Sequence, residues 1–261
     1  MWEKKCNFAI TMKSLLTIFT ALTICSFALS CTHAEVAPKG HGPFDTLVIT
    51  TDSLPGEQTL PEGFVYLTDV IPDVLLDIRY FSEYNFVGTR IDGYERPVAI
   101  CTKAAAEALS KVADNLRKKG YLLKIFDAYR PQRAVDHFFR WASDPADQKM
   151  KQYFYPNMSK ESIFKYGYVA RKSAHTRGCT FDLTLFDMNL EQEVDMGGTF
   201  DFFGGVSAPD YKNITAKQHE NRMLLQRAMI AGGFSPCRGE WWHFKLNNEP
   251  FPNKSFDFPV R

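Results

Sequence analysis

The chain has 261 residues, of which 45% are hydrophobic and 23% are charged, and these values suit one globular domain with a sizeable core. Its 31 basic and 30 acidic residues leave a formal net charge of +1. This balance gives no electrostatic reason to expect a nucleic-acid partner or direct binding to an anionic membrane face, and we expect neither.

Lysines near the start of the chain precede an apolar run over 15–29, an order typical of a secretory signal. The run is short for a membrane span. It ends at Ser30 and Cys31, and a small residue directly before a cysteine resembles the lipobox of bacterial lipoproteins, in which the cysteine is lipidated. We therefore expect Cys31 to carry a lipid anchor.

This leader sets the expected domain organisation: a lipoprotein signal peptide over 1–30, a tether over 31–45 and one folded domain over 46–261. Met1 and Met12 are both candidate starts of translation. The protein is expected to be exported to the periplasm or cell envelope, with the lipid on Cys31 as its membrane attachment. The alternative is plain secretion, after cleavage near residue 30 or after residue 34.

Strand and helix patterns are interleaved in the rest of the chain without a regular strand–helix–strand rhythm. In chain order they predict strands over 65–67 and 75–79, a helix over 102–119, a strand over 121–126, a helix over 132–142, a strand over 180–185, a helix over 215–231 and a strand over 240–246. Thr215 is the expected N-cap of the last helix, and glycines follow the first and the last. We expect an α+β fold with a mostly antiparallel central sheet flanked by helices.

The predicted domain contains three cysteines, Cys101, Cys179 and Cys237. An exported protein can keep a disulfide, but the odd number leaves at least one thiol unpaired, and the spacing does not choose a pair. We expect Cys179, which lies inside the motif described next, to be a small buried residue and not a metal ligand.

Two histidines and an aspartate form a candidate metal-ligand set. His175 lies in a predicted turn, Asp182 on the strand that follows, and His243 in the sequence Glu-Trp-Trp-His. Catalytic zinc takes three protein ligands and keeps one position open for water, whose pKa it lowers to about 7. Glu240, three residues before His243, supplies a carboxylate that can act as a base. A lone histidine is more often structural, but the four residues together predict a zinc hydrolase.

Glu240 and His243 impose a geometric condition. Residues three apart on a regular strand face opposite sides of a sheet, so both side chains reach one site only if Glu240 lies before the strand or on a bulge. Gly239 is compatible with either arrangement. Of the two residues between them, Trp241 and Trp242, we expect at least one to pack in the core, and the other is a candidate wall of the substrate pocket.

Arg130 lies in a turn directly after the predicted strand 121–126, a place where functional side chains are commonly presented. Its planar fork of donors suits a carboxylate or a carbonyl oxygen that becomes an oxyanion. The alternative is a structural ion pair with Asp127, and both interpretations stay open at this point.

A longer pattern resembles the VanX-type D-alanyl-D-alanine dipeptidases, a branch of the zinc D,D-peptidases. The resemblance covers about residues 63–261. The segments that carry it are 80–86, 92–94, 127–131, 165–169, 173–178, 181–185, 196–197, 200–202, 239–243 and 256–260.

The resemblance implies a zinc D,D-peptidase/Hedgehog-like fold and one zinc per chain. It implies a set of zinc ligands, which are His175, Asp182 and His243. It implies that Glu240 is the catalytic base and that Arg130 stabilises the transition state. It also implies that the small pocket around the dipeptide is shaped by Ser173, Asp201 and Tyr80.

The expected activity is zinc-dependent hydrolysis of the small molecule D-Ala-D-Ala, in the metabolism of peptidoglycan precursors or turnover products. Asp201 is the candidate partner of the free ammonium of the dipeptide, because only an anion matches that group. One alternative is a zinc D,D-carboxypeptidase that acts on peptidoglycan stems through a more open pocket. Another is a non-catalytic zinc-bearing lipoprotein that binds cell-wall peptides, which the presence of both Glu240 and Arg130 disfavours.

Overall fold

The structure is a computed structural model that describes residue 56 and residues 58–261. The predicted signal peptide, Cys31 and the tether lie outside the described residues, so the leader and the domain boundaries stay predictions. Among the described residues, no helix has both the length and the apolar character needed to cross a membrane.

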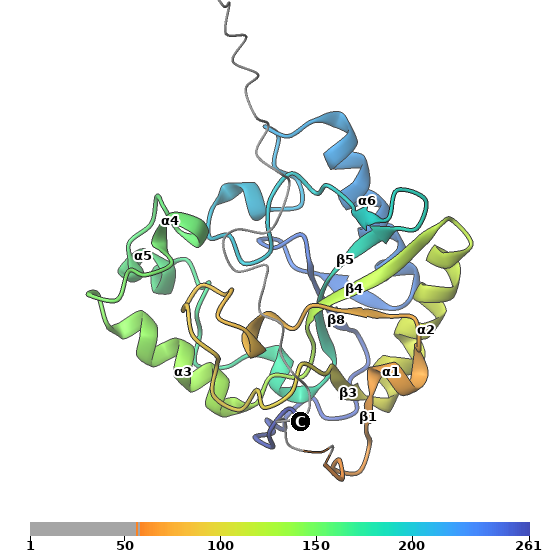
Figure 1. Cartoon of the computed structure of the whole chain (residues 1–261), viewed down its shortest axis with the longest axis horizontal. Helices are drawn as coiled ribbons and strands as arrows, with labels where there is room; N and C mark the ends of the chain where they lie inside the picture. Colours follow the sequence, from red (N-terminus) through yellow and green to blue (C-terminus); the bar gives the residue numbers. More distant parts are fainter. Residues whose placement is uncertain (1–55, 57) are drawn as a thin grey trace, which may run out of the picture. The chain divides into compact units, whose positions relative to one another are not determined.

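A mixed sheet of six strands forms the centre of the fold (Figure 1). The strand order is β2 (Leu75–Leu76), β4 (Tyr121–Asp127), β5 (Thr180–Asp187), β8 (His243–Leu246) and β7 (Phe234–Pro236), and β6 (Gln192–Glu193) also pairs with β5. Strand β2 is parallel to β4, and the other pairings are antiparallel. The prediction of a mostly antiparallel sheet is therefore confirmed only in part. The chain reaches β4 from β2 through a strand and a helix, and such a crossover connection allows parallel pairing.

A second, two-stranded sheet pairs β1 (Phe64–Tyr66) with β3 (Ile100–Thr102) in antiparallel register. The α-helices are α1 (Leu67–Val70), α2 (Lys103–Arg117), α3 (Gln132–Ser143), α4 (Lys151–Phe154), α5 (Lys160–Lys165) and α6 (Ala216–Ala231). Short 3₁₀ helices are η2 (Arg79–Phe81), η3 (Ala174–Arg177) and η4 (Gly205–Ser207). Helix α2 lies on one side of the central strands, and α3, α4 and α5 lie on the other (Figure 1).

The three predicted helices correspond to α2, α3 and α6 to within two residues at each end. Thr215 caps α6 as expected, and the cap is reciprocal: the Gln218 amide N–H donates to Thr215 Oγ1 at 3.2 Å, and the Thr215 amide N–H donates to Gln218 Oε1 at 2.8 Å. Local capping chemistry therefore suffices to place this helix.

Two predicted strands are longer than the observed ones. The pattern over 75–79 gives only β2, because the chain turns into η2 at Arg79 and this turn buries Tyr80. The pattern over 240–246 gives β8, which begins at His243. Both shortened ends lead into the region where the predicted site residues gather.

Strand β5 is buried on both faces, and its alternation separates two kinds of side chain. Phe181, Leu183 and Leu185 share one face and belong to the apolar core. Asp182 and Thr184 point to the other face, where they are also buried. A central strand with one polar buried face can present a carboxylate inside the protein without exposing it to bulk solvent.

Aromatic packing joins α3 to the loops on its side of the sheet. The ring of Phe138 lies 4.9 Å from that of Tyr80 and 4.8 Å from that of Phe86, measured between centroids. Contacts of this kind add to the burial of apolar area and hold rings in fixed orientations.

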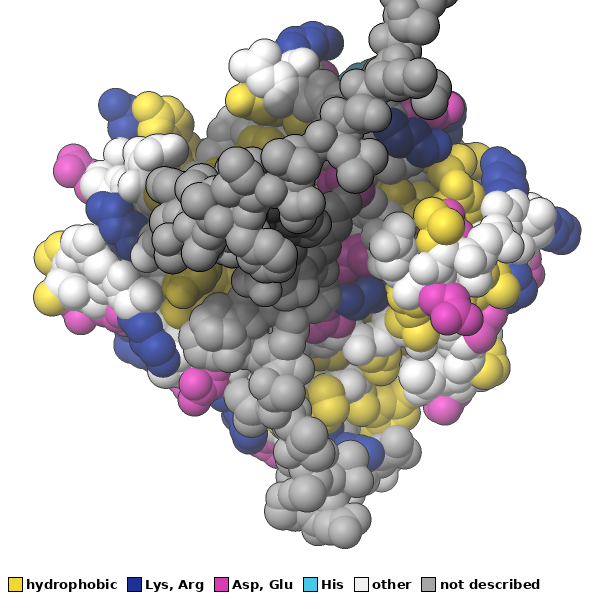
Figure 2. All heavy atoms as spheres, turned by 45° about the horizontal axis from the view of Figure 1, so that its top comes forward, with side chains coloured by type: hydrophobic (Ala, Val, Ile, Leu, Met, Phe, Trp, Pro, Cys, Tyr) yellow, Lys and Arg dark blue, Asp and Glu magenta, His cyan; other side chains and the backbone are white. Residues whose placement is uncertain are grey.

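On the face shown in Figure 2, side chains of both charge signs are interspersed, and the coloured surface has no extended region of one sign.

Candidate active site

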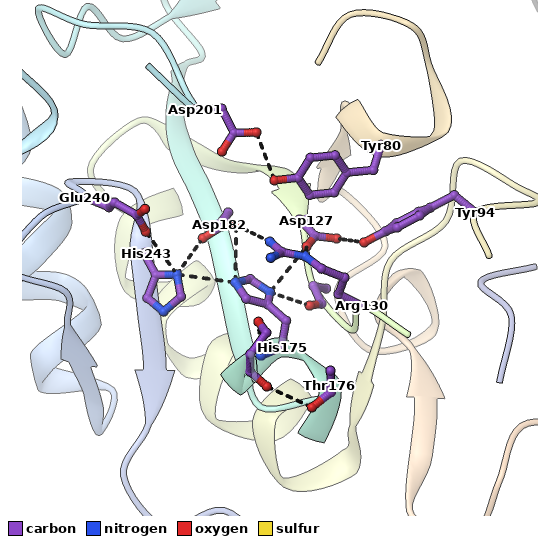
Figure 3. Close-up of polar contacts among 12 residues, drawn as sticks. Tyr80, Tyr94, Asp127, Arg130, His175, Thr176, Asp182, Asp201, Glu240 and His243 are labelled. Atoms are coloured by element: carbon purple, nitrogen blue, oxygen red, sulfur yellow. Dashed lines mark hydrogen bonds and ion pairs between the residues drawn. The ribbon is translucent and has the colours of Figure 1, made fainter. Parts of the chain in front are cut away.

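His175, Asp182 and His243 converge as predicted (Figure 3). One candidate ligand atom from each lies within 4.8 Å of the others. His175 Nε2 is 3.3 Å from Asp182 Oδ2, and His243 Nδ1 is 3.0 Å from Asp182 Oδ1. The two histidine nitrogens that face each other, Nε2 of His175 and Nδ1 of His243, are 3.3 Å apart.

The backbone brings these side chains together by two devices. Asp182 and His243 are direct register partners of the antiparallel pair β5 and β8. His175 lies in η3, which ends at Gly178 with a φ of +71°. A Cβ at Gly178 would lie 2.3 Å from a ring carbon of Phe64, so the left-handed turn and the close packing both require glycine there.

The orientation of His175 suits a metal ligand. Its Nδ1 lies 2.7 Å from the carbonyl oxygen of Ala128, which can only accept a hydrogen bond. In the neutral imidazole the proton therefore sits on Nδ1, and the lone pair of Nε2 points toward Asp182 and His243. A backbone carbonyl that orients a histidine in this way is a common support for metal ligands.

The donor set fits zinc, since two imidazoles and one carboxylate supply three nitrogen and oxygen ligands beside a cavity. Burial opposes ionisation of Asp182, but the neighbouring His175 and His243 outweigh burial and hold the pKa of the carboxyl well below its usual range. The aspartate is thus kept in the anionic form that a cation requires.

Glu240 lies in the turn just before β8, which confirms one of the two arrangements that its spacing from His243 allowed. Its Oε2 is 3.5 Å from His243 Nδ1. Burial raises the pKa of the Glu240 carboxyl, although the nearby His243 opposes the shift. Glu240 therefore lies beside the candidate ligand set with a strengthened affinity for a proton.

Arg130 makes the ion pair that one interpretation of its sequence position predicted, and it also lies at the candidate site. Its Nε donates to Asp127 Oδ2 at 2.9 Å, so the predicted ion pair is present. Its Nη2 also reaches Asp182 Oδ2 at 3.3 Å, and its guanidinium carbon lies 4.9 Å from the ring centroid of Tyr80. Asp127 is fully buried and also accepts a 2.6 Å hydrogen bond from the Tyr94 hydroxyl. The guanidinium is therefore held rigidly at the wall of the site.

Asp201 and Tyr80 meet across the cavity from the histidines (Figure 3). The Tyr80 hydroxyl donates to Asp201 Oδ2 at 2.9 Å. Asp201 has a φ of +61°, a left-handed conformation that is uncommon for a residue with a side chain. Burial and the repulsion from Asp182 raise the pKa of its carboxyl well above the usual range. A strained, buried carboxyl inside a cavity is a feature of functional sites.

All the site residues predicted from the sequence line one cavity of about 420 Å³. They are Tyr80, Arg130, Ser173, His175, Asp182, Asp201, Glu240 and His243. The cavity volume suits a small molecule. The hydroxyl of Ser173 accepts a hydrogen bond from the His175 amide at 3.3 Å, so this side chain also caps η3.

The two tryptophans divide as expected, since both are buried and Trp242 also lines the cavity. The residues that line the cavity and that sequence reasoning did not assign to the site include Lys172 and Cys237. Lys172 directly precedes Ser173, and Cys237 lies three residues before Glu240, so proximity in sequence to a predicted site residue was the signal available.

The cysteines of the described residues, Cys101, Cys179 and Cys237, all carry free thiols. Cys179 is buried as predicted and lies outside the candidate ligand set. Its Sγ is 3.0 Å from Thr102 Oγ1, and burial raises the pKa of its thiol to about 11. A thiol with so high a pKa is a poor nucleophile and a poor metal ligand at neutral pH.

A histidine–aspartate–histidine set with a carboxylate and a guanidinium around one cavity is the constellation of a metal-dependent hydrolase. Comparison with known proteins gives the family. Residues 61–261 match peptidase family M15, described as D-ala-D-ala dipeptidase. The chain therefore belongs to this family, and the resemblance inferred from its motifs is confirmed.

Individual relatives agree with this assignment. The chain is 40% identical to the D-alanyl-D-alanine dipeptidase of Enterococcus faecalis over 201 residues, which are 77% of this chain and 100% of that protein. It is 37% identical to the D-alanyl-D-alanine dipeptidase of Streptomyces coelicolor over 197 residues, 76% of this chain and 98% of the relative. For the Escherichia coli protein of the same name, the identity is 32% over 182 residues, 70% and 83% of the two chains.

Proposed function

We propose that this protein is a zinc-dependent dipeptidase that hydrolyses D-Ala-D-Ala. The observation that carries the proposal is the meeting, in one cavity, of a three-ligand set with Glu240, Arg130 and Asp201. The relatives that bear the name D-alanyl-D-alanine dipeptidase support the choice of substrate.

In the proposed enzyme His175, Asp182 and His243 hold one zinc ion. The ion supplies Lewis acidity and, by lowering the pKa of water to about 7, a source of hydroxide at neutral pH. Glu240 takes a proton from the attacking water and returns it to the leaving amine. Its raised pKa suits both steps, because a base works best when its pKa approaches the working pH.

Arg130 is proposed to donate hydrogen bonds to the carbonyl oxygen of the substrate as negative charge develops on it. The ion pairs with Asp127 and Asp182 fix the guanidinium before the substrate arrives. Donors that are already oriented need not reorganise during the reaction, and this is the main source of their effect on the rate.

Asp201 and Tyr80 are proposed to bind the free ammonium of the dipeptide, and Ser173 to line the same small pocket. The carboxyl of Asp201 holds a proton readily in the free cavity because burial raises its pKa. An ammonium group placed beside it favours the ionised form, so we expect substrate binding to expel that proton. A peptidoglycan stem has no ammonium at this position, so the pocket favours the dipeptide over the stem.

Asp201→Ala is expected to lower kcat/KM for D-Ala-D-Ala by about 10²–10³-fold, because the ammonium then enters a buried pocket without an anionic partner. The loss should be much smaller for an N-acylated dipeptide, which has no ammonium to bind. Steady-state kinetics on both substrates measure the difference. Asp210→Ala is the control and should behave as the wild type, because it removes an exposed carboxylate from the connection over 194–215 that also contains Asp201. Equal cleavage of both substrates by the wild type would identify a carboxypeptidase and refute the dipeptide assignment.

We further propose that the protein is an exported lipoprotein anchored through Cys31, on the basis of the leader described above. The wild type should incorporate a labelled fatty acid in a bacterial host, and Cys31→Ser should not. Equal labelling of the two proteins, or a mature N-terminus beyond residue 31, would contradict lipidation and favour a soluble exported enzyme.

A further inference from the structure

The residue proposed to select the substrate lies in a long connection. Residues 194–215 join β6 to α6, and η4 is the helical part of this segment. Asp201 lies within it in a left-handed conformation. A strained residue keeps its conformation only where the surrounding structure imposes it. The contacts that hold this loop are therefore of functional interest.

Arg222 of α6 makes the contacts that bracket Asp201. Its Nε donates to the carbonyl oxygen of Met196 at 2.6 Å, and its Nη1 donates to the carbonyl oxygen of Ala208 at 2.7 Å. One acceptor precedes Asp201 in the loop and the other follows it. The planar guanidinium fixes the separation of its donors, so it ties the two limbs of the loop at a defined spacing.

Two other side chains of α6 also form hydrogen bonds with the connection that contains Asp201. Asn221 Nδ2 donates to the carbonyl oxygen of Asp195 at 2.8 Å, and Gln218 Nε2 donates to Asp195 Oδ2 at 3.1 Å. The loop is also tied to the turn that carries Glu240, because the Trp241 amide donates to the carbonyl oxygen of Ser207 at 2.9 Å. The Arg222 guanidinium carbon lies 5.9 Å from the Trp241 ring centroid.

An arginine in this place is energetically expensive. Arg222 is 1% exposed, and its Nη2 has no hydrogen-bond partner among the described residues. A buried charged group is costly to desolvate, and an apolar side chain of similar volume in such a place is often neutral or stabilising. The Arg222 guanidinium donates two directed hydrogen bonds to the two segments of the loop, which an apolar side chain could not do.

We propose that Arg222 is a positioning residue for substrate recognition, which acts by holding the loop over 196–208 so that the Asp201 carboxylate faces the cavity. This inference rests on the proposed function, because it concerns how the free ammonium of the dipeptide is recognised. Arg222 lies outside the residues that line the cavity, so it acts on the substrate through other residues, and Asp201 is the cavity-lining carboxylate between the two segments that it holds.

A double-mutant cycle tests the proposal. Arg222→Met keeps much of the side-chain length and removes the fork, and Arg227→Met, at an exposed position of the same helix, is the matched control. Rates are measured per bound zinc and well below the melting temperature of each variant, so that loss of folded protein does not count.

Arg222→Met should lower kcat/KM for D-Ala-D-Ala by about 10–100-fold, mainly through a higher KM. In the Asp201→Ala background the same substitution should change kcat/KM by less than about 3-fold, because the group that it positions is gone. Equal losses in both backgrounds would overturn the proposal. An inactive wild type would instead refute the proposed function.

Amide hydrogen exchange gives a readout that does not depend on activity. Relative to Arg227→Met, Arg222→Met should speed exchange in residues 196–208 and leave the central strands unchanged. Acceleration spread evenly over the domain, or no acceleration in this loop, would show that Arg222 has no specific positioning role.

Discussion

Replacing Glu240 by alanine is expected to lower kcat by at least about 10²-fold, with the metal content and the fold unchanged. The reason is that Glu240 lies beside His243 but outside the set of three candidate ligands. Its removal takes away the group that moves the proton and leaves the groups that hold the ion. Kinetics on D-Ala-D-Ala, elemental analysis and a thermal melt measure the three quantities.

The conservative variant Glu240→Gln refines this test. The amide keeps the shape of the side chain but does not accept a proton from water, so kcat should fall as far as in the alanine variant. Loss of zinc together with activity would make Glu240 a ligand. Turnover near that of the wild type in either variant would remove this residue from the mechanism.

His243→Ala is expected to remove most of the bound zinc and with it the activity, because two protein ligands hold zinc far less well than three. The wild type should contain about one zinc per chain by elemental analysis. His219→Ala on α6, which lies outside the residues that line the cavity, is the matched control and should retain its zinc. Unchanged zinc content in His243→Ala would refute the ligand assignment.

Much of the site could be predicted because its chemistry is concentrated in short motifs. His175 and Asp182 lie on either side of a glycine turn, and Glu240 and His243 lie on either side of two tryptophans. The alternation rule left two arrangements for Glu240, before the strand or on a bulge, and the structure shows the first, with Glu240 in the turn that precedes β8. These inferences depended on neighbours in sequence, which local rules describe well.

Contacts between distant segments could not be derived from local rules. Tyr80 and Asp201 are 121 residues apart, yet their side chains are hydrogen-bonded. Only the family resemblance placed them in one pocket. The left-handed conformation of Asp201 is likewise imposed by its surroundings, since aspartate has no strong preference for it.

The sheet illustrates the same limit. Strand β2 has two residues and pairs in parallel with β4, an arrangement that no periodicity in so short a segment can predict. Helices α4 and α5 are also short, with four and six residues, and too little of an amphipathic pattern fits in them for detection. The long helices α2, α3 and α6 were predicted because their periodicity and caps extend over several turns.

Release of free D-alanine by the purified wild type tests the central proposal most directly. The zinc-loaded protein is given D-Ala-D-Ala or a pentapeptide stem that ends in D-Ala-D-Ala, and a chelator-treated sample is the control. The proposal predicts rapid release from the dipeptide, loss of release on chelation, recovery with added zinc, and release from the stem slower by at least about 10²-fold, because the stem leaves Asp201 without its cationic partner. Equally fast release from the stem would show a carboxypeptidase, and no release from either substrate with zinc bound would show a protein that binds without catalysis.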